Sequence, residues 1–235
     1  MFAVAAVIRC STHVLTDHHE PTTTGSPERT HTMTDTQNTP VEQATEAVSA
    51  LRVVDGVTLP AAGTYVLDPM HTRIGFVARH LMVTKVRGAF REFTGSITIG
   101  DDHTASTAEA TLQTASIDTG TPDRDKHLVS GDFLEVEKFP TITFGNARVT
   151  GQKGSDFTVV GDLTIKGVTR EVTLDVELDG VAKDPWGNEK LAVTAKTEID
   201  REDFGITWNV ALESGGVLVS KKVTIEIEAQ AARQA

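Results

Sequence analysis

The chain has 235 residues and a formal net charge of −11 at pH 7. This acidic balance argues against nucleic acid or an anionic membrane surface as a partner, because both select for clustered Lys and Arg. The single cysteine, Cys10, excludes an intramolecular disulfide and a Cys-rich metal site. Aromatic residues make up only 5%, and the apolar residues are chiefly Val, Ile, Leu and Ala, which favours strands over a helical bundle.

Residues 1–57 are predicted to form a disordered tail. They are rich in Thr, Ser, Pro, Glu and His and carry 7 acidic against 3 basic residues, a composition that buries too little apolar surface to order itself. The apolar run from Ala3 to Ile8 is shorter than the roughly 20 residues of a membrane span and lacks the features of a signal peptide, so a cytoplasmic location is expected. Met33 is a candidate alternative start of translation.

From Leu59 onward, apolar and polar residues alternate as in β-strands. In the strand predicted over 72–81, Ile74, Phe76, Ala78 and His80 share one face because successive side chains of a strand point to opposite sides. Further strands are predicted over 63–68, 85–99 and 106–117, and the glycines of 85–99 indicate a bend of the kind that a closing sheet needs.

The block from Thr121 to Phe144 interrupts this alternation. Thr121 is a suitable N-cap and Pro122 a suitable first residue for a short helix, which Gly131 is expected to end. Phe139-Pro140 then returns the chain to an extended conformation. We interpret the block as a lid between two halves of a β-structure.

After this block the strand pattern resumes. Lys166-Gly167 is predicted to be a hairpin turn and residues 184–188 a loop. The strands are expected over 157–165, 172–178, 191–199, 204–208 and 217–227. Eight or nine strands with short connections predict an up-and-down barrel or a sandwich.

Few residues have the spacing of a reactive site. His71 and His80 lie nine positions apart on one continuous strand, which places them on opposite faces, so no metal site is expected. There is no Gly-x-Ser-x-Gly motif and no Gly-rich phosphate loop. We therefore expect no catalytic residues, no cofactor and no enzymatic activity.

The inside of such a barrel is either filled by side chains or open to an apolar ligand. Small residues on the apolar faces, such as Ala110 and Gly161, leave room for a ligand. The alternative is a solid core filled by side chains. His80, Lys221, Arg124 and His127 are candidates for contacts with a polar head group, or for ordinary rim and surface residues. The charged run 200–203 is expected to be a solvated turn.

Five strings of the sequence resemble the YceI-like polyisoprenoid-binding proteins. They occur in family order, and they are YVLDPMHTRIGFVARH (65–80), GAFREFTG (88–95), HLVSGDFLEVEKFPTITF (127–144), GDLTIKGVTREVTL (161–174) and IDREDFGITWN (199–209). The resemblance implies an all-β fold over 58–235, an eight-stranded antiparallel lipocalin-like barrel with a short helical insert between strands. It also implies an interior that holds a long isoprenoid or a similar amphiphile.

The function expected on this basis is non-enzymatic binding, sequestration or transport of a long-chain isoprenoid, quinone-like or fatty amphiphile. The candidate ligand-binding residues are Ile74, Phe76, Ala78, His80, Phe90, Leu112, His127, Phe133, Phe144, Leu163 and Trp208. Two alternatives are an enzyme that uses His80 or His127 as acid or base on such a lipid, and a solid-cored stress-response protein. The expected partner is a long-chain apolar small molecule, and a homodimer is a further alternative.

Overall fold

The computed structural model describes residues 52–54, 56–213 and 215–234. The expectations for the tail up to residue 51, including the alternative start at Met33, therefore lie outside the described residues. The described part begins with a hairpin of β1 (Arg52–Val54) and β2 (Val57–Leu59), whose residues lie on both sides of the expected boundary at residues 57 and 58.

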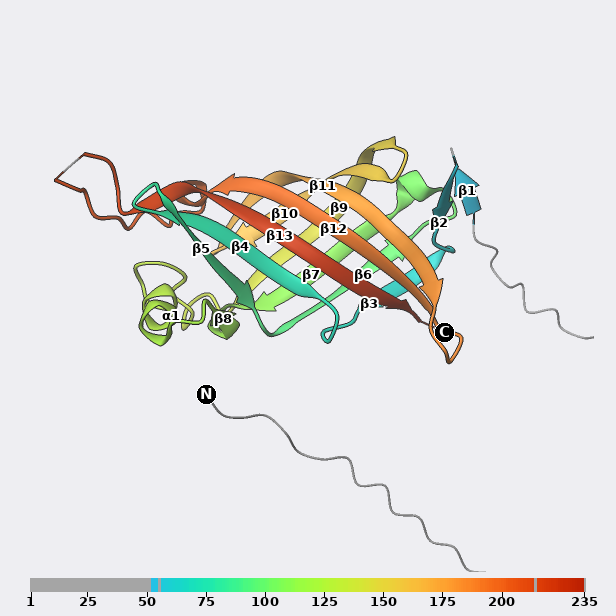
Figure 1. Cartoon of the computed structure of the whole chain (residues 1–235), viewed down its shortest axis with the longest axis horizontal. Coiled ribbons are helices and arrows are strands. Elements are labelled where there is room, and N and C mark those ends of the chain that lie inside the picture. The colour runs from blue at the N-terminus through green and yellow to red at the C-terminus, as the bar shows by residue number, and fades with distance from the viewer. Residues whose placement is uncertain (1–51, 55, 214, 235) are drawn as a thin grey trace, which may run out of the picture. The chain divides into compact units, whose positions relative to one another are not determined.

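The remaining strands form one antiparallel sheet that closes on itself, as Figure 1 shows. They are β3 (Gly63–Leu67), β4 (Arg73–His80), β5 (Thr84–Phe90), β6 (Phe93–Ile99), β7 (Thr107–Gln113), β8 (Ile117–Asp118), β9 (Thr141–Lys153), β10 (Asp156–Ile165), β11 (Val168–Lys183), β12 (Glu189–Asp200) and β13 (Val219–Arg233). The closed ring runs β13-β12-β11-β10-β9-β7-β6-β3 and back to β13. The predicted all-β, eight-stranded antiparallel barrel is confirmed.

The last strand, β13, closes the barrel along its whole length because two consecutive strands share its free edge. Residues Ala231–Arg233 pair with β3, and residues from Val219 to Glu228 pair with β4. Beyond β4 the sheet continues through β5 to β8. A register shift between Val219 and Val223 marks a bulge where β13 bends.

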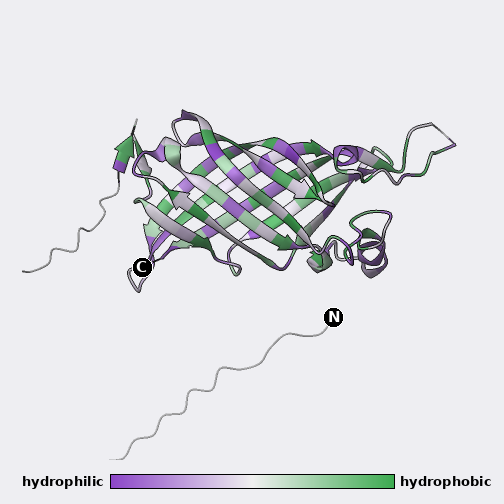
Figure 2. Ribbon diagram, turned by 180° about the vertical axis from the view of Figure 1, so that it is seen from behind, coloured by the Kyte–Doolittle hydropathy of each residue, from purple (hydrophilic) through white to green (hydrophobic). Residues whose placement is uncertain are grey.

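The alternation of the sequence explains which side chains face inward. Figure 2 shows hydrophilic and hydrophobic residues alternating along the strands, as expected for a sheet with one dry and one wet face. Two clusters of buried apolar residues result. The larger one includes Ile74, Leu112 and Phe204, and the smaller one contains Tyr65, Leu191 and Ala231.

The short helix α1 (Pro122–Leu128) begins where the sequence predicts, with Pro122 in its first turn. The Thr121 side chain makes no capping hydrogen bond; its carbonyl oxygen instead accepts the Asp125 N–H at 3.0 Å. The helix ends before the predicted stop at Gly131. The reason is that Ser130 leaves the α-helical pattern: its N–H and its hydroxyl both donate to the His127 carbonyl, at 3.1 and 2.8 Å.

Three predicted strands differ from the observed ones. The stretch 85–99 is split at Arg91 and Glu92 into β5 and β6, and 106–117 is split by a 3-10 turn at Thr114–Ser116 into β7 and β8. Residues 204–208 are not a strand: a 3-10 helix at Arg201–Phe204 leads into irregular chain. Gly205, at φ 74°, ends that helix in the left-handed region, which breaks the extended pattern.

Candidate ligand cavity

The interior of the barrel holds two adjoining apolar chambers. The first, toward α1, has a volume of about 220 Å³, and the second has about 190 Å³. Both are lined by the same five residues at the waist between them: Ile74, Ala110, Phe144, Leu174 and Ile227. The two chambers therefore form one continuous lining along the barrel.

Glycines on neighbouring strands keep the waist and the first chamber open. The ring of Phe76 lies over Gly88, where an added Cβ would stand 2.4 Å from the ring, and Phe144 lies over Gly161, where it would stand 2.5 Å away. Any larger residue at these glycines would push the ring off the wall. The aromatic side chains thus lie against the strands instead of filling the lumen.

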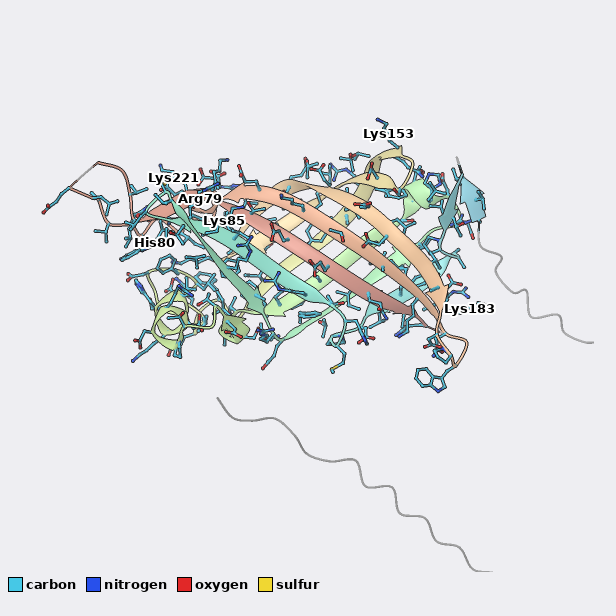
Figure 3. All side chains as sticks on the ribbon, viewed as in Figure 1. Arg79, His80, Lys85, Lys153, Lys183 and Lys221 are labelled. Atoms are coloured by element: carbon cyan, nitrogen blue, oxygen red, sulfur yellow. The ribbon has the colours of Figure 1, made fainter. Side chains whose placement is uncertain are left out.

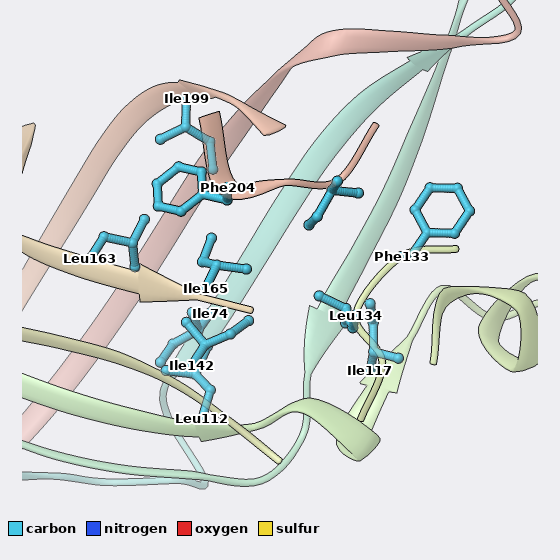
Figure 4. Close-up of a cluster of buried hydrophobic side chains, with 11 residues drawn as sticks. Ile74, Leu112, Ile117, Phe133, Leu134, Ile142, Leu163, Ile165, Ile199 and Phe204 are labelled. Carbon is cyan, nitrogen blue, oxygen red and sulfur yellow. The ribbon is translucent and has the colours of Figure 1, made fainter. Parts of the chain in front are cut away.

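The segment that follows α1 covers one end of the first chamber. Leu128, Phe133 and Leu134 contribute to its lining, and Figure 4 shows Phe133 and Leu134 at one end of a cluster most of whose other members lie on strands. Backbone hydrogen bonds from Leu134 N to Leu128 O (3.0 Å) and from Val136 N to Val129 O (3.1 Å) fold this segment onto itself.

An aromatic cluster joins this segment to the irregular chain before β13. The His127 ring meets Phe133 edge to face, with 5.0 Å between ring centroids, and meets Trp208 at 4.7 Å. Phe133 and Trp208 are 5.2 Å apart. His127 Nε2 also lies 2.8 Å from Asp132 Oδ2. Such pairs contribute about 0.5–1.5 kcal/mol each, so the cluster holds the covering segment against the chain before β13. His127, Phe133 and Trp208 are called the latch below.

The first chamber is almost wholly apolar. Thr197 and Arg201 are its only lining residues with polar side chains. Arg201 is 4% exposed, and burial lowers the pKa of its guanidinium. Its Nε donates to Ser220 O at 3.0 Å, and its Nη1 donates to Ile206 O. The guanidinium therefore connects the 3-10 helix Arg201–Phe204 to β13 and to the loop that follows this helix.

A buried polar group closes the opposite end of the barrel. Glu189 accepts hydrogen bonds from the Ala61 N–H at 3.0 Å and from the Tyr65 hydroxyl. Burial, followed by the hydrogen bond to Glu189, raises the pKa of the Tyr65 hydroxyl. Because Leu59 and Pro60 line the second chamber just before Ala61, this contact holds the segment that covers the chamber.

The comparison with known proteins covers the barrel described above. The sequence matches the model of the YceI-like domain over residues 65–231. The chain belongs to the YceI-like family. A UPF0312 protein of Staphylococcus aureus (strain N315) is 44% identical over 169 residues, which cover 71% of this chain and 95% of the relative.

Three solved structures share the barrel. The Campylobacter jejuni YCEI protein has a TM-score of 0.57 and 28% identity, covering 67% of this chain and 90% of its own. Burkholderia cenocepacia BcnA has a TM-score of 0.59 and 22% identity, covering 70% and 98%. A polyisoprenoid binding domain from Saccharophagus degradans has a TM-score of 0.52 and 18% identity, covering 72% and 98%. The last two are similar in fold alone.

Most of the candidate ligand-binding residues lie around the first chamber of this YceI-like barrel. The structure brings eight of them into its lining: Ile74, Phe76, Ala78, Phe90, Leu112, Phe133, Phe144 and Leu163. His80, His127 and Trp208 line neither chamber. His80 is exposed at the end of β4, where the strand has already left the cavity, and the other two belong to the latch.

Several lining residues were not among the candidates. Ile199, Ile225 and Ile227 lie on strands whose alternation was recognised, so their inward direction was available from the pattern. Phe204 and Ile206 follow no strand pattern and reach the chamber through the 3-10 helix and the loop after it. No local periodicity reveals such positions.

The remaining polar candidates make contacts outside the chambers. Arg124 donates to Thr119 Oγ1 at 2.7 Å, and exposed Lys221 pairs with Glu202 at 2.7 Å. The run 200–203 is not simply a solvated turn, because Arg201 within it is buried. Among the described residues no group of three or more His, Cys, Asp and Glu side chains is arranged to hold a metal ion.

Among the helices formed by the described residues, none has the length and apolar character needed to cross a bilayer.

Proposed function

We propose that this YceI-like protein binds a long-chain isoprenoid, quinone-like or fatty amphiphile in its barrel and carries or sequesters it without chemical change. The observation that carries the proposal is the pair of apolar chambers that share one waist. A lining with so few polar side chains offers little to a head group, so the chain of the ligand lies inside and its head lies at an end.

The dimensions favour a long chain. The residues of β9 that line the two chambers run from Ile142 to Val149, which at about 3.3 Å per residue and with a tilt near 40° extends about 18 Å along the barrel axis. One leaflet of a bilayer has a hydrocarbon thickness of about 15 Å. A ligand that fills both chambers is therefore at least as long as an ordinary acyl chain, which favours long-chain ligands over short ones.

The burial of such a chain supplies the affinity. Each buried methylene contributes roughly 0.8 kcal/mol, and the cost of association is about 4–15 kcal/mol. About twenty buried carbons contribute about 16 kcal/mol, which is enough to outweigh that cost.

The enzyme alternative finds no geometric support among the described residues. His80 and His127, the proposed acid or base, line neither chamber, and His127 Nε2 is already placed 2.8 Å from Asp132 Oδ2. Neither ring therefore contacts the part of the ligand that lies in the two chambers.

Native mass spectrometry of the freshly purified full chain tests the proposal. We expect a co-purifying lipid, or uptake of a long prenyl alcohol by the delipidated protein, with the mass of the ligand unchanged over time. A protein that holds no lipid and takes up neither a prenyl alcohol nor a fatty acid would refute it. A ligand whose mass changes during incubation would favour the enzyme.

A further inference from the structure

The turn between β4 and β5 presents three consecutive apolar side chains to solvent. The exposed fractions of Leu81, Met82 and Val83 are 44%, 52% and 77%. The patch continues onto the chain before β13: Leu81 N donates to Leu218 O at 2.8 Å, and Leu218 N donates to Val210 O at 3.0 Å. Val210 is itself 45% exposed. Leu81, Met82, Val83 and Val210 are called the apolar tip below.

Folding alone does not account for the residues of this turn. Leu81 and Met82 have φ angles of 53° and 60°, in the left-handed region that bulky side chains disfavour. Asn-Gly is the pair that such a turn prefers, and it would also remove exposed apolar surface. The Leu-Met pair is unfavourable on both counts, which indicates a role outside the fold.

The hairpin that carries the tip is strongly basic. Residues 72–90 contain Arg73, Arg79, Lys85 and Arg87 and no acidic residue, in a chain whose net charge is −11. Arg79 and Lys85 are exposed and directly opposite each other across the two strands, a like-charge pairing that is destabilising by itself. Neither forms an ion pair with a carboxylate of the described residues.

The tip lies beside the first chamber. Ala78, three residues before Leu81, and Val219, directly after Leu218, both contribute to the chamber lining. Arg79, His80, Lys85 and Lys221 gather at this end of the barrel in Figure 3, the end at which α1 lies in Figure 1.

We propose that this end of the barrel docks on an anionic lipid bilayer, with the apolar tip inserted among the head groups and Arg79 and Lys85 against lipid phosphates. As the site where ligand is loaded or released, it rests on the proposed carrier function. The net charge of the whole chain does not oppose the docking, because charges more than about 8 Å from the surface are largely screened at physiological salt. At this end Lys221 is paired with Glu202, so the attraction is assigned to Arg79 and Lys85.

Co-sedimentation of the full chain with lipid vesicles tests the docking. Vesicles of phosphatidylcholine alone are compared with vesicles in which one third of the lipid is phosphatidylglycerol. We expect binding to the anionic vesicles, weakened by added salt, and little binding to the neutral ones. Each basic residue near an anionic surface contributes roughly a five-fold factor, so Arg79→Gln/Lys85→Gln should reduce the partition coefficient by about 25-fold.

The double variant Leu81→Asn/Met82→Gly separates docking from folding. Asn and Gly suit the positive φ angles, so the melting temperature should stay or rise while vesicle binding falls at least ten-fold. Val83→Ser is a second variant that leaves the turn backbone unchanged and should also weaken binding. Trp186→Ser is the matched control, since Trp186 is 85% exposed on the hairpin between β11 and β12; its vesicle binding should equal that of the wild type.

Three results would overturn the docking: equal binding of the wild type to neutral and anionic vesicles, no binding to either, or tip variants that bind as well as the wild type. Loss of binding in Trp186→Ser as large as in the tip variants would overturn it as well. Native mass spectrometry distinguishes the two proposals. Bound lipid without vesicle binding contradicts the docking alone, and vesicle binding without bound lipid contradicts the carrier function alone.

Discussion

Blocking the waist of the barrel should make the affinity insensitive to ligand length beyond the chain that fills the first chamber. Ala110 on β7 lines both chambers and lies opposite Phe144 on β9. Ala110→Phe places a second ring beside Phe144 and separates the two chambers. The first chamber, at about 220 Å³ beside 190 Å³ for the second, is then about half of the total volume.

The size of the effect follows from the carbons that the second chamber no longer buries. An isoprene unit of five carbons gains about 4 kcal/mol on burial, and ordering it costs about 2 kcal/mol, as for a long side chain. The net gain of roughly 2 kcal/mol corresponds to about 30-fold in affinity for each unit. A chain that loses two units from the second chamber should therefore bind about a thousand-fold more weakly.

The assay is a series of prenyl alcohols of increasing length, titrated into the delipidated wild type and the variant by displacement of a fluorescent fatty acid. In the wild type the affinity should rise with each unit until both chambers are full. In Ala110→Phe it should rise equally at first and then stop. Thr111→Phe is the matched control, because it adds the same ring to the adjacent position on the outer face of β7.

Two results would refute the reasoning. If Ala110→Phe weakened short and long chains by the same factor, the substitution would act on the fold and not on the waist, which thermal unfolding would show independently. If the long chain retained its full advantage in Ala110→Phe, the ligand would not pass the waist at all.

Three further predictions concern the cavity wall, the latch and the acid stability. Gly161→Ala should turn the Phe144 ring into the lumen and weaken long-chain binding in the same titration, whereas Gly151→Ala, where an added Cβ meets nothing closer than 3.6 Å, should not. Trp208→Ala removes two aromatic pairs of about 0.5–1.5 kcal/mol each, so stopped-flow transfer of ligand to acceptor vesicles should be about 5- to 160-fold faster; an unchanged rate would mean that the latch does not control release. The hydrogen bond from His71 lowers the pKa of Asp68 from its usual 3.8, so its stabilising contribution is present above that pH and is lost as the pH falls through the lower folded value. The melting temperatures of the wild type and Asp68→Asn should differ at pH 7 and converge in acid, and a difference that is constant with pH would contradict this.

Much of the barrel could be predicted because alternation is a local property. The period of two in 72–81 and 157–165 specifies both a strand and its inward face, and that is why Ile74, Phe76, Ala78 and Leu163 line the first chamber as expected. The helix start at Pro122 was equally local, since cap and first-turn preferences depend on adjacent residues.

Other features could not be read from the pattern because they depend on residues far apart in the chain. His80 continues the apolar parity of β4, but the strand leaves the cavity before reaching it. In the sequence Arg201 is part of a charged run that is expected to be solvated. Only the fold buries its side chain and brings it to the carbonyls of Ser220 and Ile206. His127, Phe133 and Trp208 are joined only by folding.

The sequence by itself determined the strands, their faces, the family and the place of the helical insert, because each of these is encoded in neighbouring residues. Only the tertiary structure decided that the interior is open, since that depends on which residue lies opposite which: Phe76 opposite Gly88, and Phe144 against Gly161. It also decided where charge gathers. The chain is acidic in sum, yet the pairing of β4 with β5 places Arg79 opposite Lys85 beside an exposed apolar turn.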